Sequence, residues 1–185
     1  VVPVFKGKSQ EKSKSFLLKA DSPVQQYLTI PVKTPKGMAI NDGSAGDLDG
    51  DGEYEIVVHL SGRGIDNPST GISGIPVFHA YSMDGTFLWE ITLGRNIREG
   101  AHYTQFMVYD LDGDGKAEFV CKTADGTIDG TGKVIGDSTR DYRNLDRNSG
   151  IFYGKVLDGP EYLTVFNGQT GEAMSTVDYV PNRFP

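Results

Sequence analysis

The chain has few of the residues on which several classes of protein depend. Its 185 residues include one cysteine, Cys121, which excludes an internal disulfide and a CxxC metal site. Cys121 lies in an apolar, strand-like run, which favours a buried and unreactive thiol. No run of 18 apolar residues is present, so the sequence predicts no membrane-spanning helix and no membrane partner.

Positive charge is also scarce. Eighteen Lys and Arg residues face 25 Asp and Glu residues, giving a formal charge of −7. This balance argues against sequence-independent binding of nucleic acid. The sequence has no glycine-rich phosphate loop before a helix and no arrangement of a nucleophilic triad. The paired carboxylates of a glycoside hydrolase cannot be singled out among its acids, so no catalytic residue is assigned.

Glycine, in contrast, is abundant. The chain has 24 glycines, about 13% of its residues against an average of about 7%. Many short strands need many turns with positive φ, so this composition favours an all-β fold over a helical bundle. Residues 1–25, with lysines among serines, are predicted to be a solvated arm or a lysine-protected edge strand. The run QYLTIPV at 26–32 is predicted to be a strand, and 34–37 a turn.

A pattern then occurs twice. GDLDGDGEYEIVV spans residues 46–58 and YDLDGDGKAEFV spans residues 109–120, so the first aspartates are 63 positions apart. Each acidic loop runs into a β-rich segment, which is followed by a hairpin signal, at Asp84-Gly85 in the first copy and at 167–171 in the second. The order loop, strand, strand, turn, strand is therefore predicted twice.

The second copy carries an insertion at 125–160 with neither helical nor strand periodicity. Long loops of this kind in compact domains are usually functional or disordered. A period of about 40–60 residues, built from short antiparallel strands, is typical of β-propeller blades. Since known propellers have at least four blades, residues 26–185 are predicted to form two or three blades of a partial β-propeller.

The two acidic loops are predicted to be calcium sites. Carboxylates occupy loop positions 1, 3, 5 and 9 in both, and a glycine at position 6 allows a sharp turn. Without a cation they would repel one another, and Ca²⁺ takes six to eight oxygen ligands where Mg²⁺ keeps its waters. No His or Cys is placed to attract zinc. The predicted ligands are Asp47, Asp49, Asp51, Glu53 and Glu55 in the first loop, and Asp110, Asp112, Asp114, Lys116 and Glu118 in the second, with Glu53 and Lys116 acting through their carbonyls.

Two other kinds of structure contain acidic loops. An EF-hand needs a glutamate at position 12, where this chain has Val58 and Cys121, and flanking helices where the flanks here are strand-like. The EF-hand is therefore excluded, and a solvated acidic turn without an ion remains the alternative. The ions are predicted to be structural and to fix the first strand of each blade.

Cationic residues gather in two segments, at 93–106 between the repeats and at 121–127 after the second acidic loop. On an acidic chain, such clusters suggest an anionic ligand, for example a uronate carboxylate. The alternative is structural, because arginines often fix loops by bonding to carbonyls. We expect the two segments to meet at one end of the blades. The predicted binding residues are Arg95, Arg98, His102, Lys122 and Asp125.

Longer blocks carry a family resemblance. The first acidic repeat, LGRNIREGAHYTQFMVYDLDGDGKAEFVCKTADGT, DGTGKVIGD and GPEYLTVFNGQTGEA resemble the rhamnogalacturonan lyases of the eleventh polysaccharide lyase family, from about residue 26 to the end. The resemblance implies an eight-bladed, calcium-binding β-propeller, secreted or periplasmic in pectin-degrading bacteria. It also implies cleavage of the rhamnose–galacturonate backbone of rhamnogalacturonan I by β-elimination.

Members of that family are several times longer than this chain. The resemblance therefore implies an N-terminal part of such a lyase, with an incomplete catalytic centre and the remaining blades as its partners. A non-catalytic calcium-dependent propeller module for adhesion or carbohydrate binding is the rival interpretation, and a purely structural fragment is a third. The blocks GRNIREGAHYTQF and KTADGT favour the lyase, because an adhesion repeat has no need of them.

Overall fold

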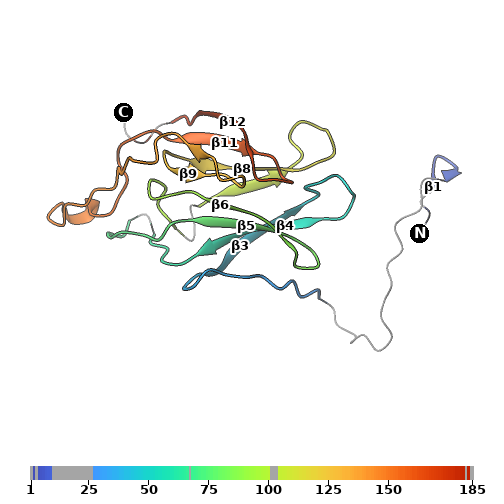
Figure 1. Cartoon of the computed structure of the whole chain (residues 1–185), viewed down its shortest axis with the longest axis horizontal. Coiled ribbons are helices and arrows are strands. Elements are labelled where there is room, and N and C mark those ends of the chain that lie inside the picture. The colour runs from blue at the N-terminus through green and yellow to red at the C-terminus, as the bar shows by residue number, and fades with distance from the viewer. Residues whose placement is uncertain are drawn as a thin grey trace.

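The computed structural model describes residues 2, 4–9, 27–66, 68–100, 104–181 and 183. The fold is all-β, as predicted, with two antiparallel sheets stacked face to face (Figure 1). The described residues contain no α-helix, and their one short helical turn is the 3₁₀ segment Gly150–Phe152. No helix in the described part of the chain is long and apolar enough to cross a membrane.

Each copy of the acidic repeat builds a four-stranded meander. The first consists of β3 (Ala39–Gly46), β4 (Glu55–Ser61), β5 (Val77–Ser82) and β6 (Phe87–Thr92). The second consists of β7 (Phe106–Tyr109), β8 (Glu118–Thr123), β11 (Tyr162–Phe166) and β12 (Ala173–Asp178). In both, each of the four strands pairs with the next of the four, although the segment 124–161 separates β8 from β11 in the chain.

The structure adds one strand to each predicted unit. The sequence pattern began each repeat at the acidic loop, but β3 and β7 precede the loops and pair with the strands that follow them. The segment INDGSAG within β3 is poor in β-branched and aromatic residues. It forms a strand because β4 beside it supplies the ladder, so propensity is overridden by pairing.

Both predicted hairpin turns are confirmed. Residues 83–86 join β5 to β6, and residues 167–172 join β11 to β12. Gly85 has φ +87°, and a Cβ there would lie 2.5 Å from Cγ of Pro31. Only glycine therefore fits this turn, because a side chain would meet both backbone strain and a neighbouring segment.

The strand predicted at 26–32 is wrong for the described residues 27–32, which form no strand. This segment instead runs across the outer face of the first sheet, where Val32 packs on the cluster formed by Val58, Leu60, Val77 and Tyr81. The Tyr81 hydroxyl donates to the Lys33 carbonyl at 3.0 Å. The turn predicted at 34–37 is present, with the Met38 N–H donating to the Pro35 carbonyl.

The other two segments without predicted strands also contain short elements. In the N-terminal arm, β1 (Val4–Phe5) and β2 (Lys8–Ser9) form a hairpin, and residues 10–25 lie outside the described residues. In the insertion, β9 (Thr127–Ile128) and β10 (Val134–Ile135) extend the first sheet beyond β6. The insertion of the second copy therefore pairs with the first.

The core lies between the two sheets. Phe78 and Trp89 of the first sheet meet Phe119 of the second, with ring centroids 4.9 Å and 5.6 Å from it. Phe166, the partner of Phe119 on the neighbouring strand β11, has its ring centroid 5.6 Å from that of Phe119. Cys121 belongs to this core, and burial raises the pKa of its thiol, so the predicted unreactive cysteine is confirmed.

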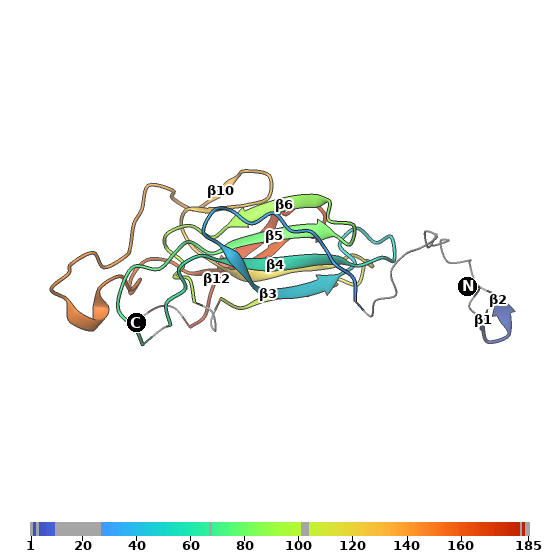
Figure 2. The same cartoon turned by 90° about the horizontal axis from the view of Figure 1, so that it is seen from below.

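The antiparallel meanders give the stack two distinct ends (Figure 2). One, the acidic-loop end, carries the loops 47–54 and 110–117 and both hairpin turns. The other, the long-loop end, carries the connections 62–76, 93–105 and 124–161. The predicted metal ligands and the described residues of the predicted anion-binding set therefore lie at opposite ends of the stack.

Candidate metal centres and a cationic loop end

The first acidic loop is folded around Asp47. Its Oδ1 accepts hydrogen bonds from the N–H groups of Gly50 at 2.7 Å and Asp51 at 3.1 Å, and its Oδ2 accepts one from Gly52 at 2.8 Å. Gly50 and Gly52 have φ of +82° and +86°. Glycines at positions 4 and 6 let the chain wrap its N–H groups inward, because neither position tolerates a side chain without strain.

The second loop repeats this arrangement around Asp110. Its two carboxylate oxygens accept from Gly113 at 2.7 Å and from Gly115 at 2.9 Å, and both glycines again have positive φ. Since the two loops share sequence and conformation but not surroundings, local sequence is what sets their shape.

Three carboxylates converge in each loop. One oxygen each from Asp47, Asp49 and Glu55 lie within 4.8 Å of one another, and the same holds for Asp110, Asp112 and Glu118. All donors are oxygen, the ligand type that hard divalent cations prefer. The donor set therefore fits a divalent metal ion, and either group could hold one.

The glutamate at position 9 is buried in both groups. Glu55 is 7% exposed and Glu118 is 5% exposed. Burial raises the pKa of Glu55 most, and the neighbouring aspartates raise it further, while the Leu48 N–H bond at 2.8 Å opposes them. A cation would relieve this repulsion, which is the physical case for an ion in the loop.

The carboxylate at position 5 stands apart from each group. Asp51 Oδ1 accepts from the Glu53 N–H, and Asp114 Oδ1 accepts from the Lys116 N–H, both at 2.8 Å. Neither aspartate belongs to the converging sets. Their predicted role as ligands, like that of the Glu53 and Lys116 carbonyls, stays a prediction.

The two acidic loops are neighbours at the junction of the sheets. The Ala117 N–H donates to the Asp47 carbonyl at 2.7 Å. A Cβ at Gly46 would lie 2.7 Å from Cγ1 of Val108, so the absence of a side chain at 46 lets β3 pack this closely against β7. The first loop thus contacts the second unit directly, a contact that no spacing in the sequence could reveal.

At the long-loop end, the two cationic segments lie side by side. Asn96 Nδ2 donates to the Asp125 carbonyl at 2.8 Å, and the Thr127 hydroxyl donates to the Leu93 carbonyl at 3.0 Å. A Cβ at Gly94 would lie 2.6 Å from the carbonyl oxygen of Gly126. The backbone therefore brings 93–96 and 124–127 together at one end of the sheets.

The predicted binding side chains have different partners. Arg98 donates to the Ser69 carbonyl at 2.7 Å, and its buried Nε and Nη1 have no acceptor among the described residues. Lys122 pairs with Glu161 at 2.7 Å. Arg95 is exposed near Asp141, whose pKa is lowered chiefly by Arg143 and slightly by Arg95. His102 lies outside the described residues.

Asp125 is a buried anchor in this arrangement. Its carboxylate accepts hydrogen bonds from the hydroxyls of Tyr142 at 3.0 Å and Tyr162 at 3.2 Å. A Cβ at Gly136 would lie 1.9 Å from its Oδ1, so the insertion closes tightly over it. These bonds fix the start of the long insertion against the second sheet.

Sequence reasoning missed three polar residues that organise the long-loop end. Asn96, fully buried, also accepts from the Tyr142 N–H at 2.9 Å. Glu99, also fully buried, accepts from the N–H groups of residues 62 and 63 at 2.8 and 2.9 Å. Glu161 accepts from Lys122 and, at 2.8 Å, from Arg183. Lone polar residues in loops give no periodic signal, so only the fold could identify them.

Fold and site together define a class of protein: a repeat protein of stacked antiparallel meanders, each with a carboxylate loop suited to a divalent cation. Residues 27–184 match the family model described as rhamnogalacturonan lyase family 11, C-terminal domain. The chain belongs to this family, as its sequence blocks predicted.

Two curated proteins similar to this chain are rhamnogalacturonan lyases. The chain is 50% identical over 194 residues to the rhamnogalacturonan exolyase YesX of Bacillus subtilis (strain 168), a match covering 99% of the chain and 30% of the relative. It is 52% identical over 176 residues to the endolyase YesW of the same organism, covering 89% of the chain and 27% of that relative. The chain thus spans about 30% of the length of the relatives it matches.

Solved structures give the same result. The match to a rhamnogalacturonan lyase PL11 of Bacillus licheniformis has a TM-score of 0.81 at 48% identity and covers 96% of this chain and 30% of that one. The crystal structure of YesX matches with a TM-score of 0.82 at 50% identity, covering 96% and 30%. The chain therefore has the fold of about 30% of the length of these solved lyases, which favours the family 11 interpretation over the adhesion module.

One detail differs from the sequence prediction. The resemblance implied an N-terminal part of a lyase, whereas the matching model is described as that of the C-terminal domain. Because the repeat pattern says nothing of what precedes it in a longer protein, sequence blocks alone could not distinguish these placements. The match assigns residues 27–184 to the domain that the family description calls C-terminal.

Proposed function

We propose that this chain is part of an enzyme that cleaves rhamnogalacturonan I by β-elimination. The observation that carries the proposal is its membership of family 11, with 50% and 52% identity to an exolyase and an endolyase. Identity is high to both, so the proposal leaves the choice between exo and endo cleavage open. The polysaccharide itself is the proposed partner.

The remaining part of the enzyme is proposed to complete a β-propeller, with residues 26–185 supplying its first blades after an arm at 1–25. The support is that two like units stack on each other, while no described sheet covers the outer face of the second unit. Leu111 of the second acidic loop is 45% exposed, and Val177 of β12 is 56% exposed. Another unit stacked in the same way would cover both.

For the reaction, a base must remove the proton at C5 of galacturonate while a cation neutralises the adjacent carboxylate, which acidifies that proton. The C4–C5 double bond forms as the glycosidic C4–O bond breaks, and the leaving oxygen takes up a proton to become a hydroxyl group. Arg95, Arg98, His102 and Lys122 are proposed to bind the uronate carboxylate, with Asp125 holding their loops in place. No catalytic base is assigned to this chain. The base is proposed to lie in the rest of the enzyme, so the catalytic centre is incomplete here.

This proposal is tested by comparing the 185-residue chain with a full-length family member in an assay for the unsaturated uronate product, followed by its absorbance. We expect little or no turnover from the chain alone and activity when all blades are present. Turnover by the chain comparable to that of the full-length enzyme would place the base within these 185 residues and refute the proposal of an incomplete centre.

Both acidic loops are proposed to bind calcium, with a structural role. The support is the oxygen-only donor set in duplicate and the raised pKa of the buried Glu55. Calorimetric titration with Ca²⁺ should give two sites, and Asp49→Ala or Asp112→Ala should each remove one. Asp146→Asn is the matched control, because Asp146 also caps a turn, through the Asn148 N–H, but has no second carboxylate grouped with it.

The full-length enzyme is proposed to act outside the cytoplasm, secreted or in the periplasm of a bacterium that degrades pectin. The argument is the size of the proposed substrate, a plant polysaccharide that must be shortened before uptake. Fractionation of a producing bacterium with antibodies against this chain tests the proposal, and enzyme confined to the cytoplasm would refute it.

A further inference from the structure

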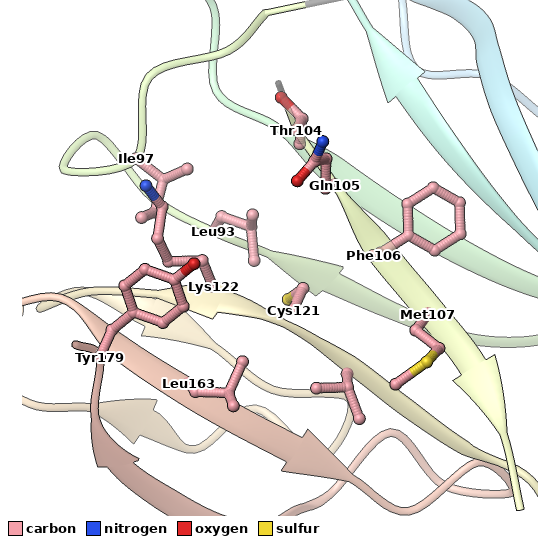
Figure 3. A pocket seen from close by; sticks show the side chains of 11 residues that line it. Leu93, Ile97, Thr104, Gln105, Phe106, Met107, Cys121, Lys122, Leu163 and Tyr179 are labelled. Atoms are coloured by element: carbon pink, nitrogen blue, oxygen red, sulfur yellow. The ribbon is translucent and has the colours of Figure 1, made fainter. Parts of the chain in front are cut away.

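The outer faces of the two sheets carry different features. On the second sheet, a cavity of about 310 Å³ lies beside β7, β8 and β11 (Figure 3), on the face that the further unit of the proposed propeller would cover. On the first sheet, residues 27–38 lie over the outer face and lead from the N-terminal arm into β3. We call residues 27–38 the strap. Beneath the strap is a line of polar groups that neither the metal sites nor the uronate site uses.

Three hydrogen bonds run in line from β6 to the strap. Glu90 Oε2 lies 2.7 Å from Nε2 of His79, whose Nδ1 lies 2.8 Å from the Tyr81 hydroxyl. That hydroxyl is in turn 3.0 Å from the Lys33 carbonyl. His79 is 5% exposed and Tyr81 is 1% exposed, whereas the Glu90 side chain is 50% exposed. Two buried side chains therefore connect a half-exposed carboxylate to the backbone of the strap.

Counting hydrogens along this line fixes the charge of the histidine. The Lys33 carbonyl can only accept, so the single hydrogen of the Tyr81 hydroxyl points to it. The hydroxyl must then accept from His79, which places a hydrogen on Nδ1. The half-exposed Glu90 is solvated as a carboxylate and can only accept as well, so Nε2 also carries a hydrogen. A histidine with both hydrogens is the imidazolium cation, so the complete line contains a charged His79.

The surroundings of the ring leave the histidine as the group that titrates. Around it, β6 contributes Glu90 and the ring of Phe87, whose centroid is 5.3 Å away, and β4 contributes the apolar Val58 at the paired position. Among the described residues, Glu90 is the charged side chain in contact with the ring. Burial raises the pKa of Tyr81, and the charge of Glu90 raises it further, although the bond to the strap lowers it. The hydroxyl therefore keeps its hydrogen where an imidazole titrates.

Loss of one proton from the imidazolium leaves three contacts with two hydrogens. The hydrogen beside Glu90 is kept, because a bare nitrogen lone pair 2.7 Å from a carboxylate would be repelled by it. Nδ1 then becomes an acceptor, and the group in place to donate to it is the Tyr81 hydroxyl. The hydroxyl must turn its hydrogen from the strap to the ring. Deprotonation of His79 therefore removes the bond to the Lys33 carbonyl.

We propose that His79 is a pH-sensitive latch for the strap: in its protonated form Tyr81 binds the Lys33 carbonyl, and in its neutral form Tyr81 binds His79 and the strap is released. Val32 and Met38 then hold the strap by apolar packing.

The latch matters because the strap joins residues 1–26 to the sheets. The pH therefore sets how firmly the N-terminal part of the chain is held against the first sheet, tightly below the titration of His79 and loosely above it. His79 and Tyr81 are already buried, so the latch needs no open surface. It is also independent of the proposed function, since none of its groups belongs to the metal or uronate sites.

The methyl group of Met38 reports the position of the strap, because it packs on the outer-face cluster. With ¹³C-methyl methionine in the 185-residue chain, the Met38 signal should move between pH 6 and pH 9 with the same midpoint as the His79 ring signals. The signals of Met107 and Met174, both exposed on the second sheet, should stay in place.

Cleavage by trypsin within the strap, after Lys33 or Lys36, gives the size of the effect. Loss of one hydrogen bond should raise the released fraction about threefold to tenfold. At pH 6, Tyr81→Phe should therefore be cut in the strap about threefold to tenfold faster than the unaltered chain, and at pH 9 the two should be cut equally fast. Comparing the proteins at each pH removes the pH dependence of the protease. Tyr109→Phe, at a tyrosine 64% exposed on β7, is the matched control and should behave as the unaltered chain does.

Glu90→Gln should have the opposite effect. The glutamine amide can donate to Nε2, so a neutral His79 keeps its hydrogen on Nδ1 and all three bonds form without an extra proton. The strap should then stay closed at both pH 6 and pH 9. An ion pair that merely stabilised the sheet would instead be weakened by this change.

Three results would overturn the latch: a Met38 signal that is constant from pH 6 to pH 9, a Tyr81→Phe protein that keeps the pH dependence, or a Glu90→Gln protein whose strap is released at pH 6. Unfolding curves show that the variants are folded, which we expect because one loses a single oxygen atom and the other changes a half-exposed side chain. None of these measurements involves cleavage of a polysaccharide, so the latch and the proposed function can fail separately.

Discussion

Leu48 and Leu111 occupy the same position of the same acidic loop, 63 residues apart, yet Leu48 is 1% exposed and Leu111 is 45% exposed. The two loops have the same left-handed glycines and the same hydrogen bonds from those glycines to the first aspartate. The difference comes from what covers them. Leu48 is packed into the core between the sheets, and no described residue covers Leu111 in this way.

The strands show the same contrast. Trp89 on β6 and Ser175 on β12 occupy matching positions in the two sheets. Val57 on β4 and Val120 on β8 match each other, because they are 63 residues apart. Two strand pairings lead from Val57 to Trp89, and the two equivalent pairings lead from Val120 to Ser175. Trp89 is 2% exposed, and Ser175 is exposed. The second sheet covers the face of the first sheet that carries Trp89. The matching face of the second sheet, which carries Ser175, has no described sheet over it.

The type of side chain at matching positions also differs with burial. His59 on β4 corresponds to Lys122 on β8. Burial lowers the pKa of His59, whose ring lies 5.1 Å from that of Phe78 in the core. Lys122, on the open face, forms an ion pair with Glu161 at 2.7 Å. The covered copy thus carries a neutral aromatic where the open copy carries an ion, which indicates that the repeat has diverged according to its surroundings.

Among the substitutions that test this difference in burial, we expect one at Trp89 to have the largest effect on stability. Trp89→Ser should destabilise the chain by about 3–5 kcal/mol, because it empties the core and leaves the Gly168 carbonyl without its 2.7 Å indole donor. The reciprocal Ser175→Trp should change stability by less than about 0.5 kcal/mol on the exposed face. Urea unfolding of both variants measures the difference, and equal losses would show that the second sheet is covered too.

A sharper test uses the matched leucines. Leu48→Ala should cost about 2–5 kcal/mol, the usual range for a buried leucine, whereas Leu111→Ala should cost a few tenths. In a full-length enzyme with a further unit on the second sheet, Leu111→Ala should become nearly as costly as Leu48→Ala. If the two variants still differ there as they do in the 185-residue chain, no unit packs over the second loop.

These comparisons also separate what the sequence could predict from what it could not. The acidic loops, their glycines and the turns at Asp84-Gly85 and 167–171 depend on residues within a few positions of one another, so local patterns found them. The stacking of Leu48 against the second unit depends on contacts between residues far apart in sequence, such as the bond from Ala117 to Asp47. No local pattern encodes such a contact.

The strand errors have the same origin. QYLTIPV has the composition of a strand, but at 27–32 it lies over the outer face of the first sheet and pairs with nothing, and Pro31 lacks an N–H for a ladder. The INDGSAG segment has the composition of a turn and is a strand because β4 pairs with it. At the candidate site, the same limit hid Glu161, whose two cations come from β8 and from residue 183.

An intermediate effect is expected at Glu55. Its folded pKa is raised above 4.5, so its ionisation costs stability in the metal-free chain once the pH rises through the folded pKa. Without calcium at pH 7, Glu55→Gln should therefore be slightly more stable than the unaltered chain, and the gain should vanish below pH 4.5.

Calcium should reverse the order of these two proteins. At 100 times the Kd, one bound ion adds about 2.7 kcal/mol, or about 5–10 °C in Tm for a chain of this size, and Glu55→Gln should lose most of that gain. Thermal melts with chelator and with Ca²⁺ measure both effects, with Glu118→Gln as the counterpart in the second loop. A Glu55→Gln protein stabilised by calcium as fully as the unaltered chain would exclude Glu55 as a ligand.

The smallest effect expected distinguishes the two hairpin turns. In the first copy the turn is held by Asp84, whose carboxylate accepts from the Ser82 hydroxyl at 2.5 Å and the Thr86 N–H at 2.9 Å. In the second copy the uncharged Asn167 does the same for the N–H groups of Gln169 and Thr170. The Ser82 hydroxyl, followed by the Thr86 N–H, lowers the pKa of Asp84 to about 2.

Because this folded pKa lies below the unfolded value of 3.8, Asp84 stabilises the chain above about pH 4, and that contribution is lost as the pH falls toward 2. Asp84→Asn should therefore be less stable than the unaltered chain at pH 5, with the gap closing as the pH falls from 4 to 2. Asn167→Asp should introduce the same acid sensitivity into the second turn. Both changes should be small and salt-dependent, since the groups are exposed. Unfolding curves across this pH range decide the matter: a gap for Asp84→Asn that is constant with pH would mean that the carboxylate's charge contributes nothing and that the two turns, like the two loops, are held by geometry alone.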